Sequence, residues 1–136
     1  MHGHYKNLQV WQKSVDLVQA VYVTTEQFPR RETYGLASQM QRAAVSVPSN
    51  IAEGQAYLSR REFLRFLRHA RGSLAELETQ LVIATRLKYV SAPESDRLLR
   101  EVAEIGRMLS GLVASLKAYE ATADSESNLT TVDADD

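Results

Sequence analysis

Residues 42–54 read RAAVSVPSNIAEG, a helical pattern with a proline near its centre and a glycine at its end. At steps of three and four residues, the apolar positions in and just before this stretch form one stripe: Leu36, Met40, Ala43, Val47 and Ile51. Polar positions form a second stripe about a quarter turn away: Gln39, Arg42, Ser46, Asn50 and Glu53. We expect one helix over about residues 33–56, kinked at Pro48 because proline lacks the N–H and clashes with the carbonyl four residues earlier. The alternative is a helix that ends at Val47, followed by a new helix with Ser49 or Asn50 as its N-cap.

The segment before this stretch predicts a helix over about residues 7–27, which ends at Phe28-Pro29 because a residue before proline avoids the helical region. It carries two apolar strips. We expect the first to face the core: Leu8, Trp11, Val15, Val18 and Tyr22. The second lies on its flank: Val10, Leu17 and Val21. This surplus of apolar surface indicates either self-association through a second buried face or one unusually wide core face.

Two more helices follow, over about residues 59–88 and from Ser91 to about residue 119. Each begins with a capping-box pattern, Ser59 with Glu62 and Ser91 with Glu94. The predicted core stripe of the third helix is Phe63, Phe66, Ala70, Leu74, Leu77, Leu81 and Ala84, and its polar stripe is Glu62, Arg65, His69, Ser73, Glu76 and Gln80. The predicted seam of the fourth helix is Leu98, Val102, Ile105, Leu109, Leu112 and Leu116. Gly106 and Gly111 interrupt this helix, and we expect them to allow a close approach of its neighbour.

Four long helices with short links predict an all-α fold, an antiparallel up-down-up-down four-helix bundle. A chain of 136 residues suffices for one such domain. We expect a flexible N-terminus over residues 1–6, the bundle over residues 7–119, and an acidic disordered tail over residues 120–136.

Charge is distributed unevenly along the chain, although the net charge is only −1. Residues 118–136 contain six acidic residues and neither lysine nor arginine. All 16 basic residues lie in residues 1–117, beside 11 of the 17 acidic ones, so the expected bundle carries a charge of +5. The tail is either a solubilising terminus or a segment that covers the basic face and weakens anion binding.

Composition excludes several kinds of chemistry. The chain has no cysteine, which rules out disulfides, thiolate nucleophiles and zinc–thiolate sites. Neither a glycine-rich phosphate loop nor the Glu-x-x-His pattern of di-iron bundles is present. His69 and Ser73 lie one turn apart but lack a third catalytic group, and His2 and His4 lie at the expected flexible end. We expect no enzyme activity, no metal and no cofactor.

No apolar run comes close to the length that a membrane span needs, about 20 residues, and the N-terminus lacks a signal-peptide pattern. We therefore expect a cytoplasmic protein without a membrane partner.

The start of the third helix is rich in arginine: Arg60, Arg61, Arg65, Arg68 and Arg71. Arginine binds phosphate through its charge and its forked donors, so this cluster is the candidate surface for RNA or DNA. The alternative is a solvated helix face or a set of arginine–carboxylate pairs between subunits. No aromatic residue recurs among these arginines except Phe63 and Phe66 of the core stripe, which argues against recognition of single strands by stacking.

The polar stripes of the second and third helices supply a candidate subunit interface: Gln39, Arg42, Ser46, Asn50, Glu53 and Glu76. Arg42 could pair there with Glu53 or Glu76 of another copy. If so, changing Arg42 or Glu53 alters assembly more than helicity.

Five segments carry a family resemblance: QMQRAAVSVPSNIAEG (39–54), VWQ (10–12), YGL (34–36), EFLRFL (62–67) and GSLAELETQL (72–81). In these segments the chain resembles the four-helix-bundle proteins encoded in intervening sequences of bacterial large-subunit rRNA genes, sometimes labelled ribosomal proteins. It is similar, more distantly, to the accessory variability proteins of diversity-generating retroelements. The resemblance spans about residues 8–117 and implies a cytosolic, ring-like homopentamer, but no settled activity. We thus expect a non-enzymatic homo-oligomer that binds RNA, DNA or a nucleic-acid-processing partner, or else a protein scaffold without a nucleic-acid role.

Overall fold

The chain folds into four α-helices and two short 3-10 helices in the computed structural model, which describes the backbone of residues 5–133 and the side chains of residues 5–119 and Glu126. The 3-10 helices are η1 (Tyr5–Asn7) and η2 (Arg30–Glu32). The α-helices are α1 (Gln9–Thr25), α2 (Leu36–Ala56), α3 (Arg60–Arg86) and α4 (Ala92–Asp133). No strand occurs between residues 5 and 133, which confirms the predicted all-α four-helix bundle.

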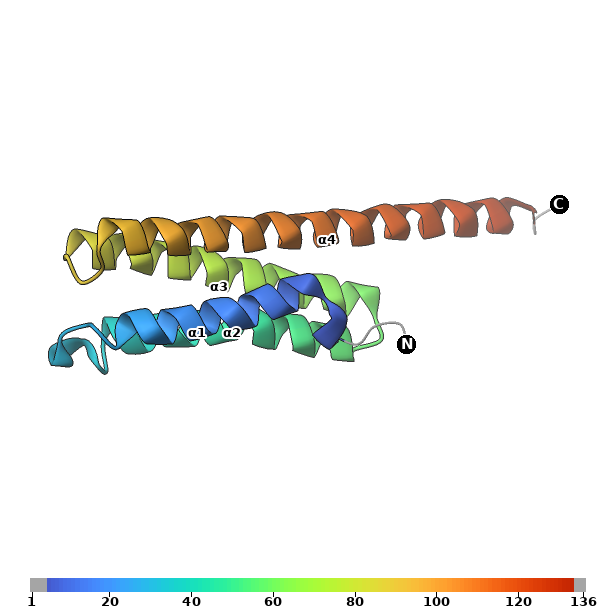
Figure 1. Ribbon diagram of the computed structural model, residues 1–136. Helices are drawn as coiled ribbons and strands as arrows, with labels where there is room; N and C mark the ends of the chain where they lie inside the picture. Colours follow the sequence, from blue (N-terminus) through green and yellow to red (C-terminus); the bar gives the residue numbers. More distant parts are fainter. Residues whose placement is uncertain (1–4, 134–136) are drawn as a thin grey trace.

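The four helices pack in a closed order, α1 on α2, α2 on α3, α3 on α4 and α4 on α1. Figure 1 shows the α1–α2 and α3–α4 connections at one end of the bundle and the α2–α3 connection at the other. The predicted stripes of α2, α3 and α4 supply most of the core, in which Met40, Val47, Leu77, Leu81 and Leu109 are fully buried. Burying each such side chain contributes about 1.5–3 kcal/mol, so these stripes account for much of the stability. Leu64 and Leu67 of α3, which lie outside the predicted stripe, are buried as well, whereas Phe63 is half-buried.

Helix α2 runs without interruption through Pro48, so the alternative of two helices separated at Val47 is wrong. Val47, Pro48 and Ile51 are all buried, and burial of both flanking apolar residues holds the two halves of the helix on one core. The side chain of Asn50 donates to the Ser46 carbonyl at 2.7 Å within the same turn. The predicted kink at Pro48 stays a prediction.

The predicted order of the two strips on α1 is wrong. Val10, Leu17 and Val21, expected on the flank, are buried, whereas Val15 and Tyr22, expected in the core, are 39% and 44% exposed. The buried strip continues through two small polar residues whose hydroxyls are bonded. Ser14 donates to the Val10 carbonyl at 2.6 Å, and Thr24 donates to Glu94 at 2.9 Å. Because these hydroxyls have partners, the two positions are buried although their residue types are polar.

The close approach of two helices occurs at Gly54 of α2 and not at the expected glycines of α4. A Cβ added at Gly54 would lie 2.6 Å from Phe66 Cβ and 3.1 Å from Phe63 Cδ1 on α3. At Gly106 the same atom would lie 3.6 Å from Leu74 Cδ2, and at Gly111 it would meet nothing within 4 Å. The expectation for Gly106 and Gly111 is therefore wrong.

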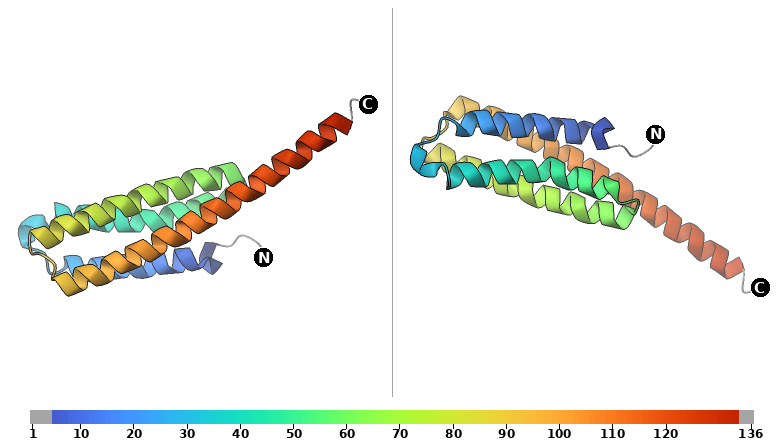
Figure 2. Two further views of the ribbon diagram at one scale, coloured as in Figure 1. Left: turned by 90° about the horizontal axis from the view of Figure 1, so that it is seen from above. Right: turned by 90° about the horizontal axis from the view of Figure 1, so that it is seen from below.

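Helix α4 continues to Asp133, past its predicted end near Tyr119 and through most of the tail expected to be disordered. No glycine or proline follows Gly111, so nothing in the sequence breaks the helix there. Figures 1 and 2 show this part of α4 extending beyond the end of the bundle that carries the α2–α3 connection. Up to Asp133, this part of α4 points away from the other helices. Whether the acidic tail covers the basic face stays a prediction. His2 and His4 lie outside the described residues.

Candidate nucleic-acid interface

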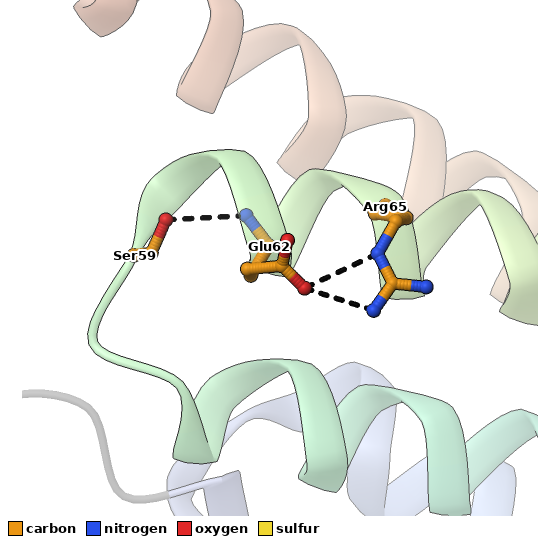
Figure 3. Close-up of polar contacts among 3 residues, drawn as sticks. All are labelled: Ser59, Glu62 and Arg65. Carbon is orange, nitrogen blue, oxygen red and sulfur yellow. Dashed lines mark hydrogen bonds and ion pairs between the residues drawn. The ribbon is translucent and has the colours of Figure 1, made fainter.

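The arginine cluster starts at the N-terminus of α3, where Ser59 caps the helix by accepting from the Glu62 N–H at 3.3 Å. The reciprocal half of the predicted capping box is wrong, because the Glu62 carboxylate turns forward to Arg65. Arg65 donates to it twice, from Nε at 3.1 Å and from Nη2 at 2.8 Å (Figure 3). The same arrangement recurs at α4: the Ser91 hydroxyl accepts from the Glu94 N–H, and the Glu94 carboxylate accepts from Thr24.

Two of the five predicted arginines are engaged within the chain. The hydrogen bond and negative charge of Glu62 raise the pKa of the Arg65 guanidinium above its ordinary value, and this group also lies 4.5 Å from the centre of the Phe66 ring. The Arg60 guanidinium stacks on the Tyr119 ring, with Cζ 3.6 Å from the ring centre. Arg60 thereby links the start of α3 to α4 where α4 leaves the bundle.

The other three arginines, Arg61, Arg68 and Arg71, are exposed. Ion pairs join Lys13 to Glu104 and Arg65 to Glu62, and none is formed by Arg61, Arg68 or Arg71 with another described side chain. Arg61, Arg68 and Arg71 thus keep their charge and their donors available to a ligand.

A groove of about 540 Å³ lies between α3 and α4 beside this cluster. Arg71 of α3 and Arg107 of α4 line it, and Leu74, Val102 and Gly106 contribute its apolar part. Glu78 and the Ser110 hydroxyl lie along the same groove. The α3 cluster therefore continues onto a second helix.

Arg107 also lines a neighbouring depression of about 470 Å³ on α4, together with Arg97 and Arg100. We call Arg71, Arg97, Arg100 and Arg107 the arginine track. Its α4 members were missed in the sequence, although their steps of three and seven residues place them on one helix face. Glu101 and Glu104 also line this depression, and Glu104 is paired with Lys13 at 2.9 Å.

The polar stripes of α2 and α3 meet each other within one chain. The hydroxyls of Ser46 and Ser73 lie 2.8 Å apart, and Asn50 donates to the Ser46 hydroxyl at 2.8 Å. These three side chains, of which Ser46 and Asn50 were candidates for a subunit interface, form a partly buried seam between the helices.

The remaining candidates of the polar stripe, Gln39, Arg42, Glu53 and Glu76, are exposed. Gln80, expected on the polar stripe, is instead only 5% exposed. Its amide donates to Glu76 at 3.3 Å, and its Oε1 has no partner among the described atoms. Whether Arg42 pairs with Glu53 or Glu76 of another copy stays a prediction.

The pair formed by His69 and Ser73 does not have the geometry of a nucleophile and its base. Ser73 is bonded to Ser46, and the exposed His69 ring lies 6.2 Å from the centre of the Phe66 ring. Within the described part of the chain, no three histidine or carboxylate side chains gather as metal ligands would. None of the helices described has an apolar stretch long enough to cross a membrane.

The fold occurs in a solved protein. The crystal structure of a protein of unknown function from the S23 ribosomal protein family of Bacteroides thetaiotaomicron superposes with a TM-score of 0.72 at 21% sequence identity. The match covers 76% of this chain and 97% of that one, and at this identity it shows a shared fold alone. No curated protein matches the chain.

The family model described as 23S rRNA-intervening sequence protein matches residues 6–111. This range includes all five arginines of the α3 cluster and the arginine track, and it ends before the part of α4 that leaves the bundle. Neither this description nor that of the solved structure names a catalytic activity. With most of its length matched, the chain belongs to the 23S rRNA-intervening sequence protein family.

Proposed function

We propose that this protein is a non-enzymatic, cytoplasmic homo-oligomer that binds RNA or DNA through the arginine-rich face of α3 and α4. The observation that carries the proposal is the group Arg61, Arg68 and Arg71, exposed and without an ion pair among the described side chains. These arginines adjoin the arginine track, to which Arg71 itself belongs. Their guanidinium groups present forked N–H donors to phosphate, and sequence-independent binding to nucleic acid depends on such contacts.

The charge distribution supports the same proposal. Residues 1–117 carry a charge of +5, and the acidic residues between 118 and 133 belong to the part of α4 that extends away from the bundle (Figure 2). The basic face of one chain is therefore open to an anionic ligand. The family description also associates the chain with 23S rRNA genes, although it names no ligand.

Self-association is proposed from the strip of α1 that the bundle leaves uncovered. Val15, Tyr22 and Val23 of α1 and Val45 of α2 are between 38% and 54% exposed, and Tyr22 and Val45 line one depression with Arg42. A second copy that covers this surface would also bring partners to Arg42, Glu53 and Glu76. A pentamer is the subunit number that the family resemblance implies.

The same exposed strip favours a second candidate function, a protein scaffold without a nucleic-acid role. The two functions differ in their response to salt, because contacts to phosphate weaken steeply as salt rises and apolar contacts between proteins do not.

Fluorescence anisotropy with a short RNA hairpin and a DNA duplex, at low and near-physiological salt, tests the proposal. The double variant Arg61→Gln/Arg68→Gln should lose most of the binding of the wild type. Arg30→Gln/Arg86→Gln is the matched control, since it removes two exposed arginines at the other end of the bundle. Equal losses of binding in both double variants would show a general charge effect. A wild type that binds neither probe would favour the scaffold function.

Light scattering on the same samples tests assembly. Arg42→Ala and Glu53→Ala should lower the mass of the oligomer without a change in helix content by circular dichroism. A monomeric wild type, or an unchanged mass in both variants, would remove the polar-stripe interface.

A further inference from the structure

We propose that the groove between α3 and α4 is the binding site of a phosphodiester strand, and that the ligand is a double-helical nucleic acid bound through its backbone. This inference rests on the proposed function and names the place and the ligand class for it.

The groove has one arginine on each of its two helices. Arg71 belongs to α3 and Arg107 to α4, and Gly106 lines the same groove. A Cβ added at Gly106 would lie 3.6 Å from Leu74 Cδ2, so a larger side chain there would occupy the space that the glycine leaves. The absence of a side chain at Gly106 therefore keeps the groove open for a strand between the two guanidinium groups.

The arginine track has a length that suits one strand. Arg97, Arg100 and Arg107 span ten residues of α4, or about 15 Å at 1.5 Å per residue. One strand of a duplex presents a charge about every 3.4 Å along the helix axis, so this span faces about four phosphates. Arg107 lines both depressions and thus joins the α4 arginines to Arg71.

The lining favours a duplex over a single strand. Neither depression has an aromatic side chain in its lining, whereas proteins that hold single strands without sequence preference stack bases on aromatic rings. Arginine, serine and an apolar floor can contact a backbone but offer no platform to unstacked bases. A duplex presents its backbone outward and needs no such platform.

Carboxylates limit the path of the strand. Glu78 lines the groove on α3, and Glu101 and Glu104 line the depression on α4. Lys13 neutralises Glu104 at 2.9 Å, which leaves Glu78 and Glu101 as the repelling groups. We expect a phosphate strand to follow the arginines and to avoid Glu78 in the groove and Glu101 in the depression on α4.

The test uses the full chain, a 20-base-pair DNA duplex, an RNA duplex of the same sequence and an oligo-dT single strand. Gly106→Leu fills the groove without a change of charge, and Gly111→Leu is its matched control because a Cβ at Gly111 meets nothing within 4 Å. We expect Gly106→Leu to weaken binding to both duplexes by about tenfold or more and Gly111→Leu to leave it unchanged. The single strand should bind about tenfold more weakly than either duplex.

The surface variants Arg71→Gln and Arg107→Gln keep the test decisive if Gly106→Leu fails to fold. Each should lower the slope of log K against log salt by about one, since each removes one phosphate contact. If the wild type binds duplex and both variants keep its slope of log K against log salt, the groove is not the binding site, although the proposed function stands. Tighter binding to the single strand overturns the ligand class, and no binding to any probe overturns the proposed function together with this inference.

Discussion

The contacts that α3 makes with α2 and with α4 differ in how they use glycine. At Gly54 the missing side chain lets α2 approach so closely that a Cβ would lie 2.6 Å from Phe66 Cβ. At Gly106 of α4 the missing side chain leaves a groove that Arg71 and Arg107 line. At its glycine, one pair of helices is thus closely packed, while the other is left open and bordered by charge. A glycine in a helix can serve packing or a surface site, and only its neighbours show which.

Both pairs depend on one core, and a charge buried there gives the largest effect. Val47 of α2 and Leu109 of α4 are each fully buried, so Val47→Glu and Leu109→Glu place a carboxylate where no partner is available. The cost of several kcal/mol is comparable to the whole stability of a domain, and both variants should unfold. Thermal unfolding by circular dichroism measures this. A cooperative transition near that of the wild type in either variant would contradict the core assignment.

The next largest effect is expected at the glycines, where substitution should change the stability of the two helix pairs in opposite directions. Gly54→Ala should destabilise the bundle by about 1–3 kcal/mol, because its Cβ forces Phe66 and Phe63 to shift in a packed interface. Gly106→Ala and Gly111→Ala should stabilise by up to about 1 kcal/mol each, since alanine is the better helix former and both sites have room. Urea unfolding of the three variants gives the comparison. The same sign of change at Gly54 and Gly106 would show that the two pairs do not differ.

A hydroxyl contact joins α3 to each of these neighbours, Ser46 to Ser73 in the α2–α3 pair and Thr85 to Ser95 in the α3–α4 pair, both at 2.8 Å. Only the α2–α3 contact is extended by an amide, that of Asn50. Ser46→Ala and Ser73→Ala should each cost about 1 kcal/mol, because each removes a partner from a partly buried hydroxyl. A double-mutant cycle should give a coupling of about 0.5–1.5 kcal/mol, in which the second change costs less than the first. Additive losses would mean that the 2.8 Å contact contributes nothing of its own.

The sequence predicted most of the core of α2, α3 and α4 because their apolar residues recur at helical steps over about four to six turns. On α1 it failed because Ser14 and Thr24 interrupt the buried strip, and their burial depends on bonds to Val10 and Glu94 that the pattern does not contain. The arginine cluster was visible as composition. The sequence did not show which of these arginines are engaged within the chain and which are available to a ligand. Arg60 is engaged because α4 places Tyr119 beside it. The groove and the contact at Gly54 each arise from how two consecutive helices pack, which the residue pattern within a single helix does not contain.

The smallest expected effect concerns the contact between the start of α3 and the point where α4 leaves the bundle. Arg60 lies over the Tyr119 ring at 3.6 Å, and Tyr119 is 61% exposed, so the stacking should contribute about 0.5–1 kcal/mol. Tyr119→Phe keeps the ring and should match the wild type in urea unfolding, whereas Tyr119→Ser should lose this amount. Amide hydrogen exchange adds a local measure, because loss of the contact should speed exchange in α4 after Lys117 without a change in the core. Equal stability of the two variants would mean that the stacking contributes nothing, and that α4 leaves the bundle without an anchor at Tyr119.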